Sequence, residues 1–178
     1  MKKKTIGLFA VLLLTSAGCG YHVVGKPEVS TGLRANGLVG GIKTISIPYF
    51  NNETQRPDVE GVVTNAFVNE FVNTVDIVDR LRADAVLEGV IKKYSLKPIS
   101  FSGADVVREY RLIVIMSVRL VRTSDRKVLW QDDEAGDDDE FDVVPDDVAA
   151  TKDAEWQALS GIAFKTARRV KERILAGD

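Results

Sequence analysis

The strongest constraint on the fold is the regular alternation of side chains in residues 110–121. Every second residue from Tyr110 to Leu120 is apolar, as expected for the buried face of a β-strand. The opposite face mixes apolar and basic residues: Arg111, Ile113, Ile115, Ser117, Arg119 and Val121. That face is too apolar for one that only meets water, so the sequence predicts a strand with one buried face and one face that meets a partner or ligand.

The rest of the chain supplies three more strands and two helices. Strands are expected over residues 43–49, 83–96 and 127–130, and the second of these has a slip in its alternation at Lys92-Lys93 that indicates a bulge. Residues 51–54 read as a turn, and residues 98–105 as the tip of a hairpin. One helix is expected from Pro57 and another from about residues 146–151.

These elements predict an α+β fold, with the order β-α-β-β-β-α. Both expected helices carry an apolar stripe, and the sheet has one fully apolar face. The stripes and the face match if both helices pack on the same side of a four-stranded sheet, as a two-layer sandwich. The other side of the sheet is then expected to stay open.

The first 18 residues have the layout of a secretory signal. A positive start, Met1 to Lys4, precedes a short apolar stretch over residues 6–14 that is far below the roughly 20 residues needed to span a membrane. We therefore divide the chain into a signal peptide (1–18), a lipidated N-terminus and tether (19–41) and a single periplasmic domain (42–178).

Cys19 is the only cysteine, and it ends a run of small residues. The run Ser16-Ala17-Gly18-Cys19 resembles the lipobox of bacterial lipoproteins, although Ser16 stands where Leu is usual. The resemblance implies that Cys19 is acylated and becomes the first residue of a membrane-anchored protein. Gly20, rather than Asp, follows it, which resembles lipoproteins released to the outer membrane. The alternative is an ordinary signal peptide with an incidental cysteine.

Composition argues against several classes of function. Removal of the signal lowers the basic residues from 24 to 21 against 26 acidic ones, a formal net charge of about −5, which disfavours nucleic acid as a partner. The only histidine, His22, lies three residues from Cys19, so no histidine triad or His-rich metal site can form. We expect a binding protein without catalytic residues, metal or cofactor.

Two charged clusters remain. The acidic cluster, residues 132–142, is interpreted as a solvated hairpin rather than a calcium loop, because its spacing does not match an EF-hand. The basic cluster spans the second to fourth expected strands: Lys92, Lys93, Lys97, Arg108, Arg111, Arg119, Arg122, Arg126 and Lys127. These cations either meet the phosphates or carboxylates of an amphiphile whose chains use Ile113 and Ile115, or are edge residues that prevent aggregation. The sequence leaves both interpretations open.

Four segments resemble the lipopolysaccharide-assembly lipoprotein family, LptE. They are the Cys19-Gly20-Tyr21-His22 start, residues 45–54 (ISIPYFNNET), residues 83–91 (ADAVLEGVI) and Glu109-Tyr110-Arg111. The resemblance covers the mature chain in order. It implies an outer-membrane lipoprotein, facing the periplasm, that plugs the β-barrel LptD and supports its assembly. It also implies a role in passing lipopolysaccharide to the cell surface, and the same fold of two helices on a four-stranded sheet.

The resemblance also implies lipopolysaccharide-binding residues. Basic residues of the family contact lipid phosphates near the hairpin between the second and third strands and near the start of the last helix. Lys152 matches the second location, whereas Ser102 stands at the first, so Lys97 or Arg108 is expected to substitute there, with Arg111 beside them.

Parts of the sequence are also similar to two other kinds of outer-membrane lipoprotein. Residues 43–49 and 83–89 resemble the curli-secretion pore subunit and the activators of penicillin-binding proteins. These similarities would imply a secretion-channel subunit or an activator of peptidoglycan synthases. Only one expected strand is regular enough for a transmembrane hairpin, which disfavours the channel. A carrier with an internal lipid cavity would need an aromatic-rich interior that the sequence lacks.

Overall fold

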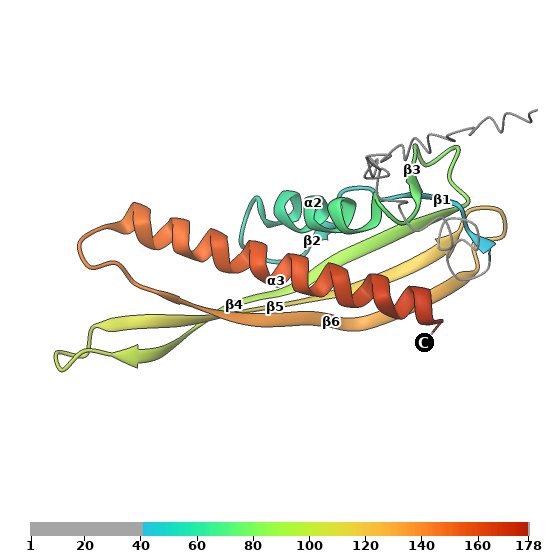
Figure 1. Ribbon diagram of the computed structural model, residues 1–178. Helices are drawn as coiled ribbons and strands as arrows, with labels where there is room; N and C mark the ends of the chain where they lie inside the picture. Colours follow the sequence, from blue (N-terminus) through green and yellow to red (C-terminus); the bar gives the residue numbers. More distant parts are fainter. Residues whose placement is uncertain (1–40, 178) are drawn as a thin grey trace, which may run out of the picture.

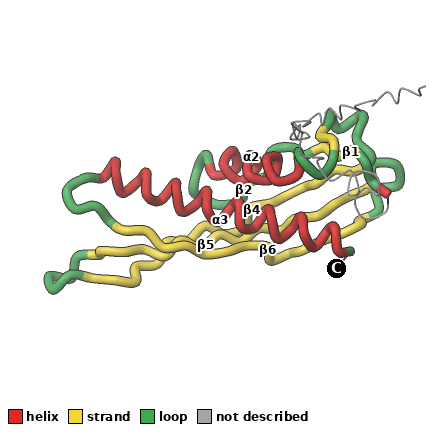
Figure 2. The backbone as a smooth tube through the Cα atoms, in the orientation of Figure 1, coloured by secondary structure: helices red, strands yellow, loops and turns green. Residues whose placement is uncertain are grey.

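The computed structural model describes residues 41–177, which form one sheet and two helices (Figure 1). In chain order the elements are β1 (Thr44–Ser46), β2 (Asn51–Asn52), α2 (Val59–Phe71), β3 (Asp76–Ile77), β4 (Ala85–Phe101), β5 (Val107–Arg122), β6 (Val128–Asp142) and α3 (Val148–Ala176). The three long strands follow one another directly and make up most of the sheet (Figure 2).

The sheet is mixed and has more strands than expected. Its order is β3-β1-β4-β5-β6, and β2 also pairs with β4. β4, β5 and β6 are antiparallel to one another, while β1 and β2 run parallel to β4. The prediction of an α+β fold is confirmed, but the prediction of four strands is wrong. The two additional strands, β2 and β3, have only two residues each and are too short to show any alternation.

The long antiparallel strands follow the sequence pattern closely. The expected bulge is confirmed, because the β4–β5 register shifts between Ile91 and Lys93. The apolar face of β5 is fully buried at Leu112, Val114, Met116, Val118 and Leu120. On β4 the same face carries Gly89, where an added Cβ would lie 2.1 Å from the ring of Phe50. Gly89 therefore leaves room for Phe50, which also packs against Phe67 at 4.7 Å between ring centroids.

Both helices lie on one side of the sheet, as expected (Figure 1). α2 buries Val59, Val63, Phe67 and Phe71, and α3 buries residues at helical spacing from Leu159 to Ile174. α3 begins just after Asp147, whose side chain accepts a hydrogen bond from the Ala150 N–H. α2 begins at Val59, two residues after Pro57. No helix within residues 41–177 has the length and apolarity needed to span a membrane.

Two boundaries differ from expectation. β1 covers only Thr44–Ser46, and the hairpin turn lies between Phe101 and Val107, later than the expected tip at 98–105. Pro98 is compatible with a strand because only β5 pairs with β4 at that point. On the other side of β4, pairing with β2 ends at Ile91, whose carbonyl accepts from the Glu53 N–H.

The largest difference is the acidic cluster, which is a strand and not a loop. β6 continues through residues 132–142 and pairs with β5 as far as Asp142. The interpretation as a solvated hairpin is wrong because the carboxylates on one side of β6 are paired with cations of α3, as described below.

Candidate functional site

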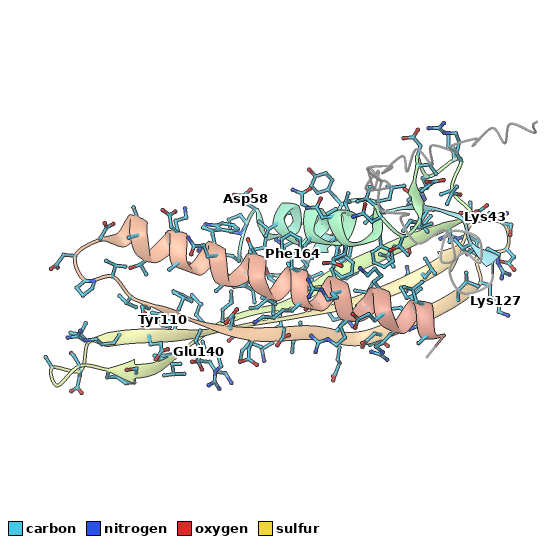
Figure 3. All side chains as sticks on the ribbon, in the orientation of Figure 1. Lys43, Asp58, Tyr110, Lys127, Glu140 and Phe164 are labelled. Atoms are coloured by element: carbon cyan, nitrogen blue, oxygen red, sulfur yellow. The ribbon has the colours of Figure 1, made fainter. Side chains whose placement is uncertain are left out.

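The face of the sheet that bears no helix is the first candidate surface. Register places side chains from three strands in rows across it: Lys97, Arg111 and Glu140, then Ser95, Ile113 and Asp138. Glu140 lies on this side of the sheet, whereas Tyr110 lies between the sheet and α3, stacked on Phe141 at 5.8 Å (Figure 3). We call this helix-free side the open face.

The open face keeps partly exposed apolar side chains at its centre. Ile113 and Ile115 are half-buried, although nothing from the helical layer covers them. Exposed Lys93 is in register with Ile115. Toward the β5–β6 turn the same face is buried at Val86 and Val121. Its exposed part is therefore the centre of the sheet and the end near the β4–β5 turn. The arrangement is an apolar strip beside cations, as the sequence predicted.

Ion pairs on this face neutralise several members of the basic cluster. Arg111 donates to Glu140 at 2.5 and 3.0 Å and lies 3.5 Å from Asp138. The hydrogen bond to Glu140 and the charges of the nearby carboxylates raise the pKa of the Arg111 guanidinium. Arg119 pairs with Glu88 at 2.8 Å. Arg111 is therefore a cation that already has protein partners, which reduces its attraction for a further anion.

Lys97, Arg108 and Lys152 are exposed, and none of them forms an ion pair within residues 41–177. Alternation places Lys97 beside Arg111 on the open face. Arg108 lies on the other side of β5, where it lines a hollow of about 190 Å³ with Val143 and Pro145 of the β6–α3 loop. Lys152 belongs to the first turns of α3. The structure thus separates the predicted cations into two pairs at the same end of the molecule. Lys97 and Arg111 lie on the open face, and Arg108 and Lys152 lie on the helix side.

That end also exposes large apolar side chains. Phe101 and Val106, at the β4–β5 turn, are 56% and 61% exposed, and Val148 at the start of α3 is 85% exposed. In Figure 1 this turn and the β6–α3 loop are together at the end of the molecule away from β1. We call this region, residues 97–111 and 142–152, the distal end. It combines unpaired cations with exposed apolar groups, which suits an amphiphilic ligand.

On the helix side, the acidic cluster and α3 form a ladder of ion pairs. Lys165 and Arg169 pair with Asp139 and Asp137 at 3.1 and 3.0 Å, and Arg173 pairs with Asp132. The three cations follow one another at four-residue spacing, so they lie on one side of the helix. Within residues 41–177 no group of three or more His, Cys, Asp or Glu side chains is arranged to hold a metal ion. The ladder connects the edge strand β6 to α3 through three ion pairs.

Sequence reasoning missed a polar cluster beneath the first half of α3. Glu155, which is 8% exposed, accepts a hydrogen bond from Arg56 at 2.8 Å and another from the Tyr94 hydroxyl at 2.6 Å. Burial and the bond to the Glu155 carboxylate raise the pKa of Tyr94, so the hydroxyl stays protonated and donates. The three residues come from distant segments and show no local pattern. The one available signal was a carboxylate on the apolar side of a helix.

The predicted lipidation site, Cys19, lies outside the described residues, as do the signal peptide and nearly all of the tether.

Comparison with known proteins gives one family match. The model of the family described as "LptE: Lipopolysaccharide-assembly" matches residues 42–174. No curated protein matches the chain.

Solved structures of bacterial proteins show similar folds at low sequence identity. A protein from Xanthomonas campestris is 11% identical with a TM-score of 0.51, and the match covers 74% of this chain and 84% of that protein. An uncharacterized lipoprotein B from Nitrosomonas europaea is 13% identical (TM-score 0.48; 76% and 83% covered). The rare lipoprotein B from Shewanella oneidensis is 17% identical (TM-score 0.43; 75% and 92% covered).

Proposed function

Because the chain belongs to the LptE family of lipopolysaccharide-assembly proteins, we propose that it is an outer-membrane lipoprotein that plugs the β-barrel LptD and supports its assembly. In this role it helps to deliver lipopolysaccharide to the outer leaflet. It faces the periplasm and acts by binding, not by catalysis. Its anchor is the acylated Cys19, and the following residues connect that anchor to the folded domain.

The open face is the observation that carries the proposal. A sheet with helices on one side and half-buried Ile113 and Ile115 on the other leaves apolar area that association with a partner would remove from water. Lys93 and Lys97 flank this strip, so the face suits a partner that offers both apolar and acidic groups.

The unpaired cations support the second half of the proposal. Lys97, Arg108 and Lys152 have no carboxylate partner among the described residues, so each can meet a phosphate without first breaking an ion pair. Arg111 contributes less because Glu140 and Asp138 already hold it. A few exposed cations bind weakly and reversibly, which suits a step in which the lipid must be passed on.

Co-purification tests the partner. From detergent extracts, the wild-type chain is expected to recover a large outer-membrane barrel. The double change Ile113→Asp with Ile115→Asp is expected to lose that barrel, because it places charges on the apolar strip of the open face. Phe164→Asp, on the outer surface of α3 where Phe164 is 40% exposed, is the matched control and should retain the barrel (Figure 3). Recovery of peptidoglycan synthases alone would contradict the proposal.

Lipopolysaccharide binding tests the ligand. Lys152→Asp is expected to weaken binding several-fold, because it replaces a cation by a charge that repels phosphate. Lys127→Asp is the matched control, since Lys127 is also exposed but lies at the opposite end of the molecule (Figure 3). Unchanged binding by a Lys152→Asp protein with a normal circular-dichroism spectrum would remove Lys152 from the site.

A further inference from the structure

We propose that Arg56, Glu155, Tyr94 and Trp156 form a binding site for a sugar ring, so that the chain recognises the saccharide part of its ligand as well as its phosphates. The inference rests on the proposed function, in which the ligand joins a polysaccharide to a lipid. It assigns a role to residues that the phosphate-binding hypothesis does not use.

The site is a hollow bounded by three separate segments. Gln55 and Arg56 from the β2–α2 loop, Tyr94 and Leu96 from β4, and Glu155 from α3 surround about 260 Å³ of open space. A second hollow of about 480 Å³ lies on α3, lined by Asp153, Trp156, Gln157 and Ser160. Arg56, which lines the first hollow, lies 5.8 Å from the ring of Trp156, which lines the second.

The polar groups of the hollow are held in place by their neighbours. Arg56 bonds Glu155 on one side, and its guanidinium lies 5.8 Å from the centroids of both the Tyr94 and the Trp156 rings. The loop that carries Arg56 is fixed by Asn52, whose side-chain amide donates to the Arg56 carbonyl at 2.8 Å and to Glu60 at 3.0 Å. A ligand would therefore meet side chains that are already oriented, at little cost in conformational entropy.

One donor in this cluster has no partner. The Nε of Arg56 is buried from water and makes no hydrogen bond with any described residue. A buried donor of this kind costs free energy unless something accepts from it. Arg56 also lines the open space of the hollow, so a small shift of its side chain would be needed for a ligand oxygen there to accept from Nε.

The chemistry favours a sugar over a bare anion. Glu155 balances the charge of Arg56, and Asp153 adds another negative charge nearby, so the hollow offers no net attraction to a phosphate. It offers the planar polar groups of Arg56, Glu155 and Gln55 beside the ring of Tyr94, and the second hollow offers the ring of Trp156. A sugar presents neighbouring hydroxyls, which both donate and accept, and a C–H face that packs on aromatic rings.

Binding of separated parts of the ligand tests the site. The full chain in detergent is titrated calorimetrically with two probes: lipid-free oligosaccharide released from lipopolysaccharide, and the phosphorylated lipid without its polysaccharide. Trp156→Leu is expected to weaken oligosaccharide binding at least tenfold and to leave lipid binding unchanged, because it keeps apolar bulk but removes the aromatic face. Lys152→Asp is expected to show the reverse pattern.

Two further variants guard against loss of folding. Arg56→Lys keeps the charge but loses the guanidinium, and it should also weaken oligosaccharide binding. Phe164→Leu makes the same kind of change as Trp156→Leu on an exposed part of α3, and it should bind both probes normally. The chain has two tryptophans, so in a Trp130→Phe background the fluorescence of Trp156 should shift on addition of oligosaccharide.

The outcomes separate this inference from the proposed function. Wild-type protein that binds lipopolysaccharide and the lipid but not the oligosaccharide would overturn the sugar site alone. Equal oligosaccharide affinity in wild type, Trp156→Leu and Arg56→Lys would overturn it as well. Oligosaccharide binding without any binding of lipopolysaccharide or its lipid would contradict the proposed function and leave the sugar site standing.

Discussion

The two faces of β5 contain similar proportions of β-forming residues but have different surroundings. On one face, every second residue from Leu112 to Leu120 is fully buried beneath the helices. On the other, Ile113 and Ile115 are half-buried, and charged residues surround them. The apolar side chains of the covered face are removed from water by the helices, whereas Ile113 and Ile115 on the open face stay partly exposed to water. Folding therefore buries one side of β5 under the helices and leaves the centre of the other side partly exposed, where we propose that a partner binds.

The largest expected effect comes from placing a charge on each face in turn. Val114→Asp would bury a carboxylate under the helices, so we expect it to destabilise the fold by at least about 4 kcal/mol. Ile115→Asp, one residue away, should cost no more than about 1 kcal/mol because its side chain faces solvent and Lys93. Urea denaturation measures both, and similar losses would show that the open face belongs to the folding core.

Close packing of the covered face predicts the next effect. Gly89→Ala pushes a methyl group into the ring of Phe50, and we expect a loss of about 1–3 kcal/mol in thermal or urea unfolding. Gly103→Ala, in the β4–β5 turn, is the control, because nothing lies within 4 Å of its added Cβ. If both variants were equally stable, the packing of Phe50 against β4 would be looser than the structure indicates.

The ladder at the rim of the covered face should contribute little per pair. Lys165→Ala removes a partly exposed partner of Asp139, so we expect a loss below about 1 kcal/mol that shrinks as salt is added. Lys152→Ala, at an exposed cation without such a pair, should leave stability unchanged. A large loss that shrank as salt was added would mean that β6 is held to α3 mainly by charge, and a loss that did not depend on salt would mean that Lys165 acts through the packing of its side chain.

The smallest effect is expected at the end of the sheet, where Asp84 accepts hydrogen bonds from the Lys43 and Thr44 N–H groups at 3.0 Å. These bonds lower the pKa of Asp84 below its ordinary value of 3.8. A carboxyl with a lowered pKa adds stability above its unfolded pKa, and that stability is lost as the pH falls through the folded value. Asp84→Asn should therefore lower the melting temperature slightly at pH 7 and hardly at all near pH 2. A difference independent of pH would contradict this assignment.

The sequence predicted the parts of the fold that repeat a pattern. The alternation of β5, the bulge at Lys92-Lys93 and the apolar stripes of the two helices all follow from local spacing. β2 and β3 could not be predicted, because two-residue strands are defined only by their partners. The prediction for residues 132–142 was wrong because a run of carboxylates by itself indicates a loop exposed to solvent. The cations of α3 that pair with these carboxylates lie far away in the sequence. The four-residue spacing of Lys165, Arg169 and Arg173 was the available signal.

The candidate sites show the same division. The mixed character of the open face was visible in residues 111–121 alone, since alternation assigns each side chain to a face. The cluster of Arg56, Tyr94 and Glu155 was not, because Arg56 and Glu155 are 99 residues apart in the chain and only the tertiary fold brings them together. Nor could the sequence tell that Arg111 is paired with Glu140 while Lys152 is not.

Site-specific photo-crosslinking from the open face is the most direct test that this face meets a partner. A photo-reactive residue at Ser117, which shares a row with Val90 on the open face, is introduced into the full-length protein in cells. We predict that this residue, in correctly folded protein, forms an adduct with a large outer-membrane barrel. The absence of any adduct at Ser117, together with adducts from the outer surface of α3 at Phe164, would contradict the account.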